Sequence, residues 1–432
     1  MIRSAAAVLL CLLVVAPARA QTIAITNARV HTMSGAPLEA ATIVVRDGRI
    51  EAVGRGIAVP AGARVVDAAG GVVTPGFIDS ATQLGVVEID AYPGTTDQSV
   101  TNDRITAAFN VADGFNPMST LIPITRVEGV TRAVVRPSTG RSLIAGQGIV
   151  VHLGDGDAAS HIVRDPAGMW ATYGEQGAAL AGGARSAAIL LLREALQDAR
   201  DYAANRAAFE QNARRDYALS RLDLEALIPV VEGRVPLVVS VERASDILTA
   251  LRLRDEFDLR MILTGVAEGW MVADEIAAAD VPVVVYPLQN IPNFERLGTT
   301  LENAARLHAA GVRVAIGTGG LDASLSSHNT CNLRFAAGVA AANGMPWDAA
   351  LAGITSTPAA IWGVSDRYGR VAPGQDADLV VWSADPLEIT TLVRHVFIRG
   401  AEVDLADTRQ RALFERYRDT ETLPQAYDRP TP

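Results

Sequence analysis

Residues 71–79 (GVVTPGFID) separate two parts of the chain that carry different sequence patterns. Before this stretch, short β-rich runs at residues 23–30, 41–45 and 49–53 alternate with turn residues, as in a small sheet domain. After it, from residue 71 to about residue 364, apolar runs alternate with helical stretches. This second pattern indicates a parallel sheet covered by helices.

The β-rich character returns after residue 365, so strands from both chain ends are expected to complete one small domain. The sequence therefore predicts an α/β fold in which a (β/α)8 TIM-like barrel at residues 71–364 is inserted into a small β-sandwich. Residues 21–70 and 365–406 would form that sandwich. Residues 407–432 are expected to be a solvated helix and a frayed end.

The first twenty residues have the pattern of a secretory signal peptide. Arg3 supplies a positive charge, residues 5–15 are apolar, and Ala18 and Ala20 form a small-residue cleavage site. The apolar stretch is shorter than the roughly 20 residues that a membrane-spanning helix needs. The sequence thus predicts a secreted, periplasmic protein, with Cys331 as the one cysteine left after cleavage.

The charge pattern excludes some partners. All 38 basic residues are arginine, and the formal net charge is −10. An acidic chain without lysine is not expected to bind nucleic acid or an anionic membrane surface.

Several phrases of the sequence resemble the amidohydrolase superfamily. Residues 73–79 (VTPGFID) resemble the entry into the barrel of cyclic amidohydrolases, and residues 373–381 (PGQDADLVV) resemble the return to the sheet. Residues 146–148 and 243–247 look like the imidazolonepropionase-like branch of that family. The resemblance implies hydrolysis of C–N bonds with one or two divalent metal ions at the barrel mouth, where bound water becomes the nucleophile.

The ligand motifs depart from that resemblance. Where the family has Asp-x-His-x-His after the first barrel strand, this chain has Asp79 followed by Ser80, Ala81, Thr82 and Gln83. The positions that the resemblance assigns to metal ligands carry side chains with little or no affinity for zinc: Ala81, Gln83, Ser240, Glu242, Gly265 and Gly319. No lysine is present to serve as a bridging ligand. The sequence thus predicts no metal cofactor and a dismantled catalytic site.

Four residues remain as candidates for chemistry: Asp79, Glu242, Asp322 and His328. The three carboxylates are an alternative ligand set for one divalent cation that prefers oxygen donors. A simpler interpretation of Glu242 is a salt bridge with the adjacent Arg243.

Four residues are candidates for substrate binding: Arg136, Ser138, Gln147 and Arg243. An arginine with neighbouring hydroxyl groups can bind a carboxylate. The structural alternative for the first three is a surface loop with turn glycines.

Two functions follow as hypotheses. The first is a pseudoenzyme that binds a small molecule and acts as the partner of an active amidohydrolase paralogue or as a homo-oligomer. The second is an active hydrolase of amide, cyclic amide or dipeptide-like substrates that uses altered ligands or a single ion.

Overall fold

The computed structural model describes four segments of the chain: residues 22–102, 104–211, 213–319 and 326–406. The predicted signal peptide, the C-terminal tail and Asp322 lie outside these segments. Within them, every helix is too short or too polar to cross a membrane.

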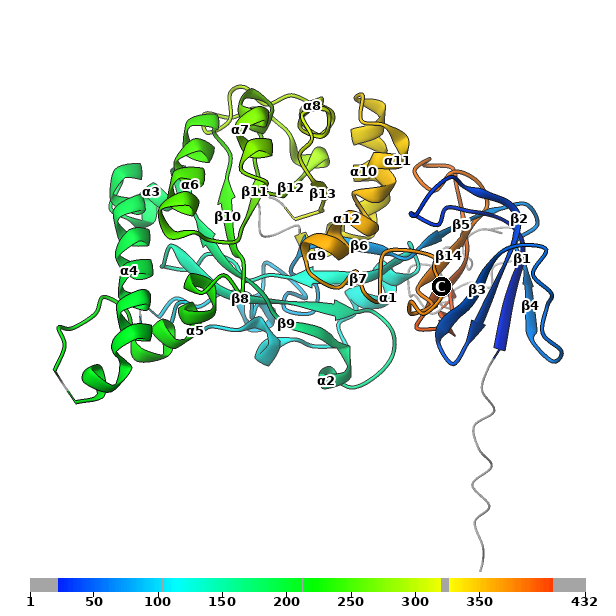
Figure 1. The fold of residues 1–432 in the computed structure, drawn as a ribbon, viewed down its shortest axis with the longest axis horizontal. Coiled ribbons are helices and arrows are strands. Elements are labelled where there is room, and N and C mark those ends of the chain that lie inside the picture. The colour runs from blue at the N-terminus through cyan, green and yellow to red at the C-terminus, as the bar shows by residue number, and fades with distance from the viewer. Residues whose placement is uncertain (1–21, 103, 212, 320–325, 407–432) are drawn as a thin grey trace, which may run out of the picture.

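Strands from the two ends of the chain form one sheet at one end of the molecule, coloured blue and orange in Figure 1. Its strands are β1 (Thr22–Val30), β2 (Leu38–Arg46), β3 (Arg49–Arg55), β4 (Arg64–Asp67), β5 (Val72–Pro75), β14 (Leu379–Trp382), β15 (Val393–Ile398) and β16 (Ala401–Glu402). The order is β16-β15-β14-β5-β1-β2-β3, with β4 paired to β1. The predicted composite sheet domain is confirmed.

This sheet has a core of its own. Ile25 and Ile43 from the N-terminal strands, Val73 from β5, and Leu379 and Phe397 from the C-terminal strands belong to one buried cluster. Burial of apolar surface from both ends of the chain therefore holds the sheet together.

The chain crosses from this sheet into the barrel at Gly76. Strand β5 ends at Pro75, and β6 begins at Phe77 in the second sheet. A Cβ atom at residue 76 would lie 2.2 Å from Oγ1 of Thr131, so only glycine fits this crossing without a shift.

The second sheet is a nearly closed barrel, as predicted. Its strands are β6 (Phe77–Thr82), β7 (Val130–Val135), β8 (Ile144–His152), β9 (Ile162–Thr172), β10 (Leu237–Val241), β11 (Met261–Gly265), β12 (Val283–Val285) and β13 (Val314–Ile316). They follow one another in chain order. Beyond the last strand, the Gly319 amide donates to the Ala81 carbonyl at 2.8 Å and so joins the two edges.

One strand differs from the regular (β/α)8 pattern. Strand β8 pairs antiparallel to both β7 and β9, whereas the other neighbours are parallel. Short connections of eight or nine residues precede and follow β8, which is too short for a crossover helix on each side. Hairpin-like returns therefore replace two β/α units in this part of the barrel.

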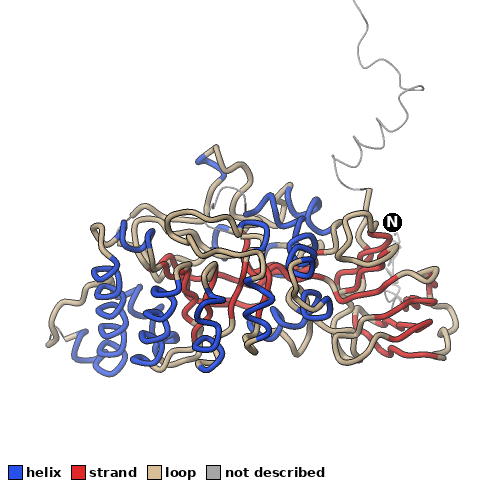
Figure 2. The backbone as a smooth tube through the Cα atoms, turned by 90° about the horizontal axis from the view of Figure 1, so that it is seen from above, coloured by secondary structure: helices blue, strands red, loops and turns tan. Residues whose placement is uncertain are grey.

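Helices lie around the barrel strands, from the end of the molecule away from the composite sheet to the side next to that sheet (Figure 2). They are α1 (Leu121–Arg126), α2 (Ala158–His161), α3 (Glu175–Leu180), α4 (Arg185–Glu210), α5 (Arg221–Val231), α6 (Ala244–Phe257), α7 (Ala273–Ala278), α8 (Asn303–Ala309), α9 (Ser326–Asn329), α10 (Leu333–Ala342), α11 (Trp347–Ala352) and α12 (Ser356–Ile361). In the long helix α4, Ala188, Leu192, Ala195, Ala199 and Tyr202 are buried at the three- and four-residue spacing of one helix face.

A buried ion pair connects the barrel to the composite sheet. Arg132 of β7 is 1% exposed, and its Nε atom donates to Oδ2 of Asp378 at 2.6 Å. The guanidinium group also lies 3.9 Å from the centre of the Tyr368 ring. Asp378 is the last residue before β14, so this contact fixes the return strand against the barrel.

Candidate functional site

The candidate site lies where the parallel barrel strands end. Asp79 lies within β6, Glu242 follows β10, Gly265 ends β11, and Gly319 comes shortly after β13. The carboxyl ends of parallel strands meet at one mouth of a barrel, which is where TIM-barrel active sites are built.

Asp79 is fully buried, and its oxygens already have protein partners. Oδ1 accepts hydrogen bonds from the amides of Ala81 at 2.9 Å and Thr318 at 3.3 Å, and Oδ2 accepts one from the Thr318 hydroxyl. Burial raises the pKa of Asp79 to about 6, although these three hydrogen bonds act in the opposite direction. The side chain is therefore part of the contact between the first and last barrel strands.

Glu242 is buried at the mouth with only part of its hydrogen-bonding capacity used. It is 3% exposed; Oε2 accepts from the Ala267 amide at 3.0 Å and lies 4.0 Å from Nη1 of Arg296. Burial raises the pKa of Glu242 to about 7, and the nearby Arg296 charge opposes that rise.

The salt bridge considered between Glu242 and Arg243 is not formed. The Arg243 guanidinium instead donates to the Phe294 carbonyl at 3.1 Å and lies 3.8 Å from the Glu295 carboxylate. Adjacent residues after a strand project in different directions, so neighbours in sequence need not pair in space.

Two of the positions that the resemblance assigns to metal ligands have neighbouring atoms where a side chain would begin. Gly265 has a φ of 88°, and a Cβ atom there would lie 2.2 Å from Oε1 of Glu242. A Cβ atom at Gly319 would lie 2.3 Å from the Ala81 carbonyl oxygen. A histidine at residue 265 or an aspartate at residue 319 would therefore require its neighbours to move.

The resemblance to amidohydrolases implies a metal site, but the described side chains at this mouth do not fit one. Within the described segments, no group of three or more His, Cys, Asp or Glu side chains could hold a metal ion. Asp79 is occupied by three donors, and Gly265 and Gly319 have no ligand atom. Asp322, the third member of the alternative carboxylate set, is outside the described residues.

Two of the predicted binding residues lie at a small cavity of about 70 Å³ inside the mouth. Arg136 and Ser138 line it together with Trp170, Ser240, Glu242 and Tyr286, among others. Gln83, which stands at another position that the resemblance assigns to a metal ligand, is buried and donates through Nε2 to the Ser138 hydroxyl. The structure thus brings these residues together.

Gln147, predicted for binding, and His328, predicted for chemistry, lie elsewhere. The Gln147 side chain donates to the Ala107 carbonyl at 3.1 Å and so holds a loop. His328 is exposed in the short helix α9, where its carbonyl accepts a hydrogen bond from the Cys331 thiol at 3.3 Å.

Sequence reasoning missed Tyr286 and Arg296. Burial raises the pKa of Tyr286 to about 12, and Tyr286 lines the mouth cavity together with Thr264. Its position just after β12 was a usable signal, because residues at the carboxyl ends of barrel strands line the site. Arg296 comes from the loop before α8, and the sequence offers no comparable signal for it.

A second cavity of about 270 Å³ adjoins the first, since Gln176, Ser240 and Glu242 line both. The remaining lining includes Tyr173, Glu175, Ala179, Val241 and Glu295. Together these two cavities form a groove, here called the Glu242 groove, from inside the mouth toward helix α3.

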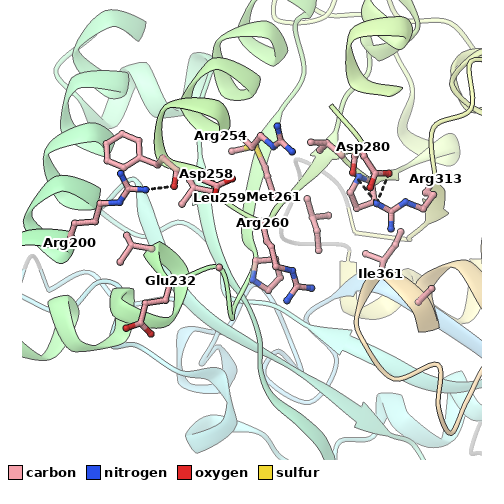
Figure 3. A pocket seen from close by; sticks show the side chains of 18 residues that line it. Arg200, Glu232, Arg254, Asp258, Leu259, Arg260, Met261, Asp280, Arg313 and Ile361 are labelled. Atoms are coloured by element: carbon pink, nitrogen blue, oxygen red, sulfur yellow. Dashed lines mark hydrogen bonds and ion pairs between the residues drawn. The ribbon is translucent and has the colours of Figure 1, made fainter. Parts of the chain in front are cut away.

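A third cavity of about 540 Å³ lies at the other end of the barrel (Figure 3). Its lining includes Pro236, Met261, Pro282 and Arg313, which stand at or next to the starts of strands β10 to β13. The active sites of TIM barrels lie at the opposite mouth, where the strands end, so this cavity is not the candidate site.

Comparisons with known proteins agree with this architecture. A sequence model of the amidohydrolase family matches residues 237–403. The solved structure of an amidohydrolase from Thermotoga maritima MSB8 has a TM-score of 0.79 and 29% identity, covering 88% of this chain and 99% of that one. Molinate hydrolase has a TM-score of 0.55 at 19% identity, covering 89% and 95%, which shows the shared fold alone.

Two curated proteins are also similar. The amidohydrolase tasK of Hapsidospora irregularis is 23% identical over 400 residues, which is 85% of this chain and 40% of that protein. A dihydroorotase of Geobacter sulfurreducens is 54% identical over 46 residues, 11% of each chain. The chain thus spans less than half the length of the curated relatives it matches. Residues 237–403 are thus similar to the amidohydrolase family, and the fold over most of the chain is similar to that of solved amidohydrolases.

Proposed function

We propose that this chain is a non-catalytic member of the imidazolonepropionase-like branch of the amidohydrolases that binds a small molecule and acts as the partner of an active relative. The observation that carries the proposal is the closed space at the vacated ligand positions. A Cβ atom at residue 265 would collide with the Glu242 carboxyl, and one at residue 319 would collide with the Ala81 carbonyl. A ligand side chain at residue 265 or 319 would thus collide with neighbouring atoms of the barrel mouth.

The length of one relative supports the partner role. The match to tasK covers most of this chain but only 40% of that protein. More than half of the tasK protein therefore lies outside the region that is similar to this chain. In our proposal, a separate partner protein would take the place of that additional part. Export to the periplasm, which the first twenty residues predict, is part of the same proposal.

The test combines metal analysis with a hydrolysis screen. We expect purified mature protein to contain well below one divalent ion per chain and to show no turnover of amides, cyclic amides or dipeptides. One bound ion per chain together with turnover would reject the proposal. Co-purification from the native host is expected to recover a histidine-complete homologue, and recovery of homo-oligomers alone would count against the partner role.

A hydrolase with altered ligands is the second candidate function. Two buried carboxyl groups at one mouth, with pKa values raised to about 6 and about 7, are the kind of perturbation found at catalytic sites. The hydrolysis screen distinguishes the two functions, because only this one predicts turnover that Glu242→Gln abolishes.

A further inference from the structure

We propose that the Glu242 groove binds an organic cation, an ammonium or guanidinium group carried on a short aliphatic chain. This inference rests on the proposed binding function and names the chemical class of its ligand.

The first observation is a buried carboxylate oxygen without a donor. Oε2 of Glu242 accepts from the Ala267 amide at 3.0 Å and lies 4.0 Å from Nη1 of Arg296, whereas Oε1 accepts no hydrogen bond from the described residues. Glu242 is 3% exposed and lines both parts of the groove. A buried carboxyl group with an unused acceptor is costly, so a ligand that donates to it gains more binding energy than it would at the surface.

The second observation is the charge of the outer part of the groove. Glu175, Glu242 and Glu295 line it, and no arginine is among its lining residues. Glu295 is already matched, since it accepts from the Glu175 amide at 2.9 Å and pairs with Arg185. Oε2 of Glu242 lies 4.0 Å from Nη1 of Arg296, which leaves Oε1 as the Glu242 oxygen that can accept from a ligand. Glu175 and Oε1 of Glu242 are therefore the two carboxylate acceptors that favour a positively charged ligand.

The third observation is the apolar wall between these carboxylates. Tyr173, Ala179 and Val241 line the same cavity of about 270 Å³. Such a wall suits the methylene groups of an alkyl amine or alkyl guanidine, whose charged end then reaches a carboxylate. A compact inorganic cation would leave this wall unused.

The cavity at the other end of the barrel shows the contrasting case. There several charged groups have protein partners: Arg313 donates to Asp280 at 3.0 Å, and Arg200 donates to the Phe257 carbonyl (Figure 3). Glu232, which lines that cavity, is bound by Arg234 at 2.8 Å. Glu232→Gln therefore serves as the control for Glu242→Gln, because it removes a carboxylate that already has a protein partner.

The experiment measures binding of butylguanidine to the full mature protein by calorimetry. Butylurea has nearly the same shape without the charge, and pentanoate carries the opposite charge. We expect butylguanidine to bind at least tenfold more tightly than butylurea, and pentanoate not to bind. Glu242→Gln should abolish the preference for the charged ligand, whereas Glu232→Gln should keep it, with circular dichroism confirming that both variants fold.

Equal affinity for butylguanidine and butylurea, tighter binding of pentanoate, or a preference that survives Glu242→Gln would overturn the inference. Failure of butylguanidine to bind a protein that lacks metal and turnover would refute this inference alone. A metal-loaded protein with amide turnover would instead refute the proposed function, whatever butylguanidine does.

Discussion

The crossing at Gly76 and the barrel mouth are both tightly packed. Residues 73–79 at the crossing resemble the amidohydrolase motif, whereas the metal-ligand motif at the mouth is not matched. At the crossing, the glycine faces Thr131 of the neighbouring strand, so the fold itself requires the residue. At the mouth, Gly265 and Gly319 stand where the resemblance assigns ligands, and they face Glu242 and Ala81. The comparison indicates that the fold itself fixes the residue type at the crossing. At the barrel mouth, only binding of a ligand would fix the residue types.

The largest expected effect tests the fold side of this comparison. Asp378→Ala would leave the buried Arg132 guanidinium without its carboxylate partner. Loss of one member of a buried pair typically costs about 3–5 kcal/mol of unfolding free energy. Urea denaturation should show this loss. Glu39→Ala, which breaks an exposed pair with Arg29, should cost less than about 1 kcal/mol. Similar losses for both variants would contradict the structural role of Asp378.

The next effect concerns the mouth and depends on pH. Asp79 has a pKa raised from 3.8 to about 6, so the folded state retains a proton that the unfolded chain releases between these values. Its contribution to stability is therefore present at low pH, falls as pH rises through about 4 to 6, and stays low above that range. The change corresponds to about 3 kcal/mol.

Asp79→Asn should remove this pH dependence. An asparagine oxygen can still accept from the amides of Ala81 and Thr318, and its NH2 group can donate to the Thr318 hydroxyl. We expect the variant to gain stability relative to wild type on going from pH 4 to pH 8, by up to about 3 kcal/mol. Urea denaturation at both pH values checks this. A constant difference between the two proteins would show that Asp79 is ionised throughout.

A smaller effect is expected from Gly76→Ala at the crossing. The added Cβ atom would lie 2.2 Å from Oγ1 and 2.3 Å from Cγ2 of Thr131, and overpacking of this kind typically costs about 1–3 kcal/mol. Thr131→Ala in the same chain should recover part of that loss, because it removes Oγ1 and Cγ2 and leaves only the Cβ contact at 2.7 Å. A shift in melting temperature measures both effects. No loss in Gly76→Ala would mean that the crossing tolerates side chains, and the comparison with the mouth would then fail.

The sequence predicted the barrel and the composite sheet because their signals are repeated and redundant. Apolar runs recur at strands such as β7, β10, β11, β12 and β13, and phrases at both chain ends identify the insertion. The reversed strand β8 was not predicted, since residues 144–152 have the same apolar character in either direction. Strand direction depends on the length of the connections and not on the composition of the strand.

The site was only partly predictable for a different reason. Asp79, Glu242, Arg136 and Ser138 could be found because they stand at or near strand ends. The partner of Glu242 could not, because Arg296 reaches it from a loop more than fifty residues away in the chain. The hydrogen bonds that occupy Asp79 depend likewise on Thr318, which is adjacent only after the barrel closes.

The smallest expected effect tests the mouth side of the comparison directly. If the closed positions no longer hold a metal, then EDTA should leave the melting temperature of the mature protein unchanged to within about 1 °C. Zinc chloride should not raise it either, because a ligand stabilises a fold only by binding the folded state more tightly than the unfolded one. A saturable rise in melting temperature with zinc, reversed by EDTA, would show that the mouth has kept a metal site. Ligand binding would then fix the residue types at the mouth, as the fold does at the crossing. The atoms next to Gly265 and Gly319 would have to move to admit the metal ion.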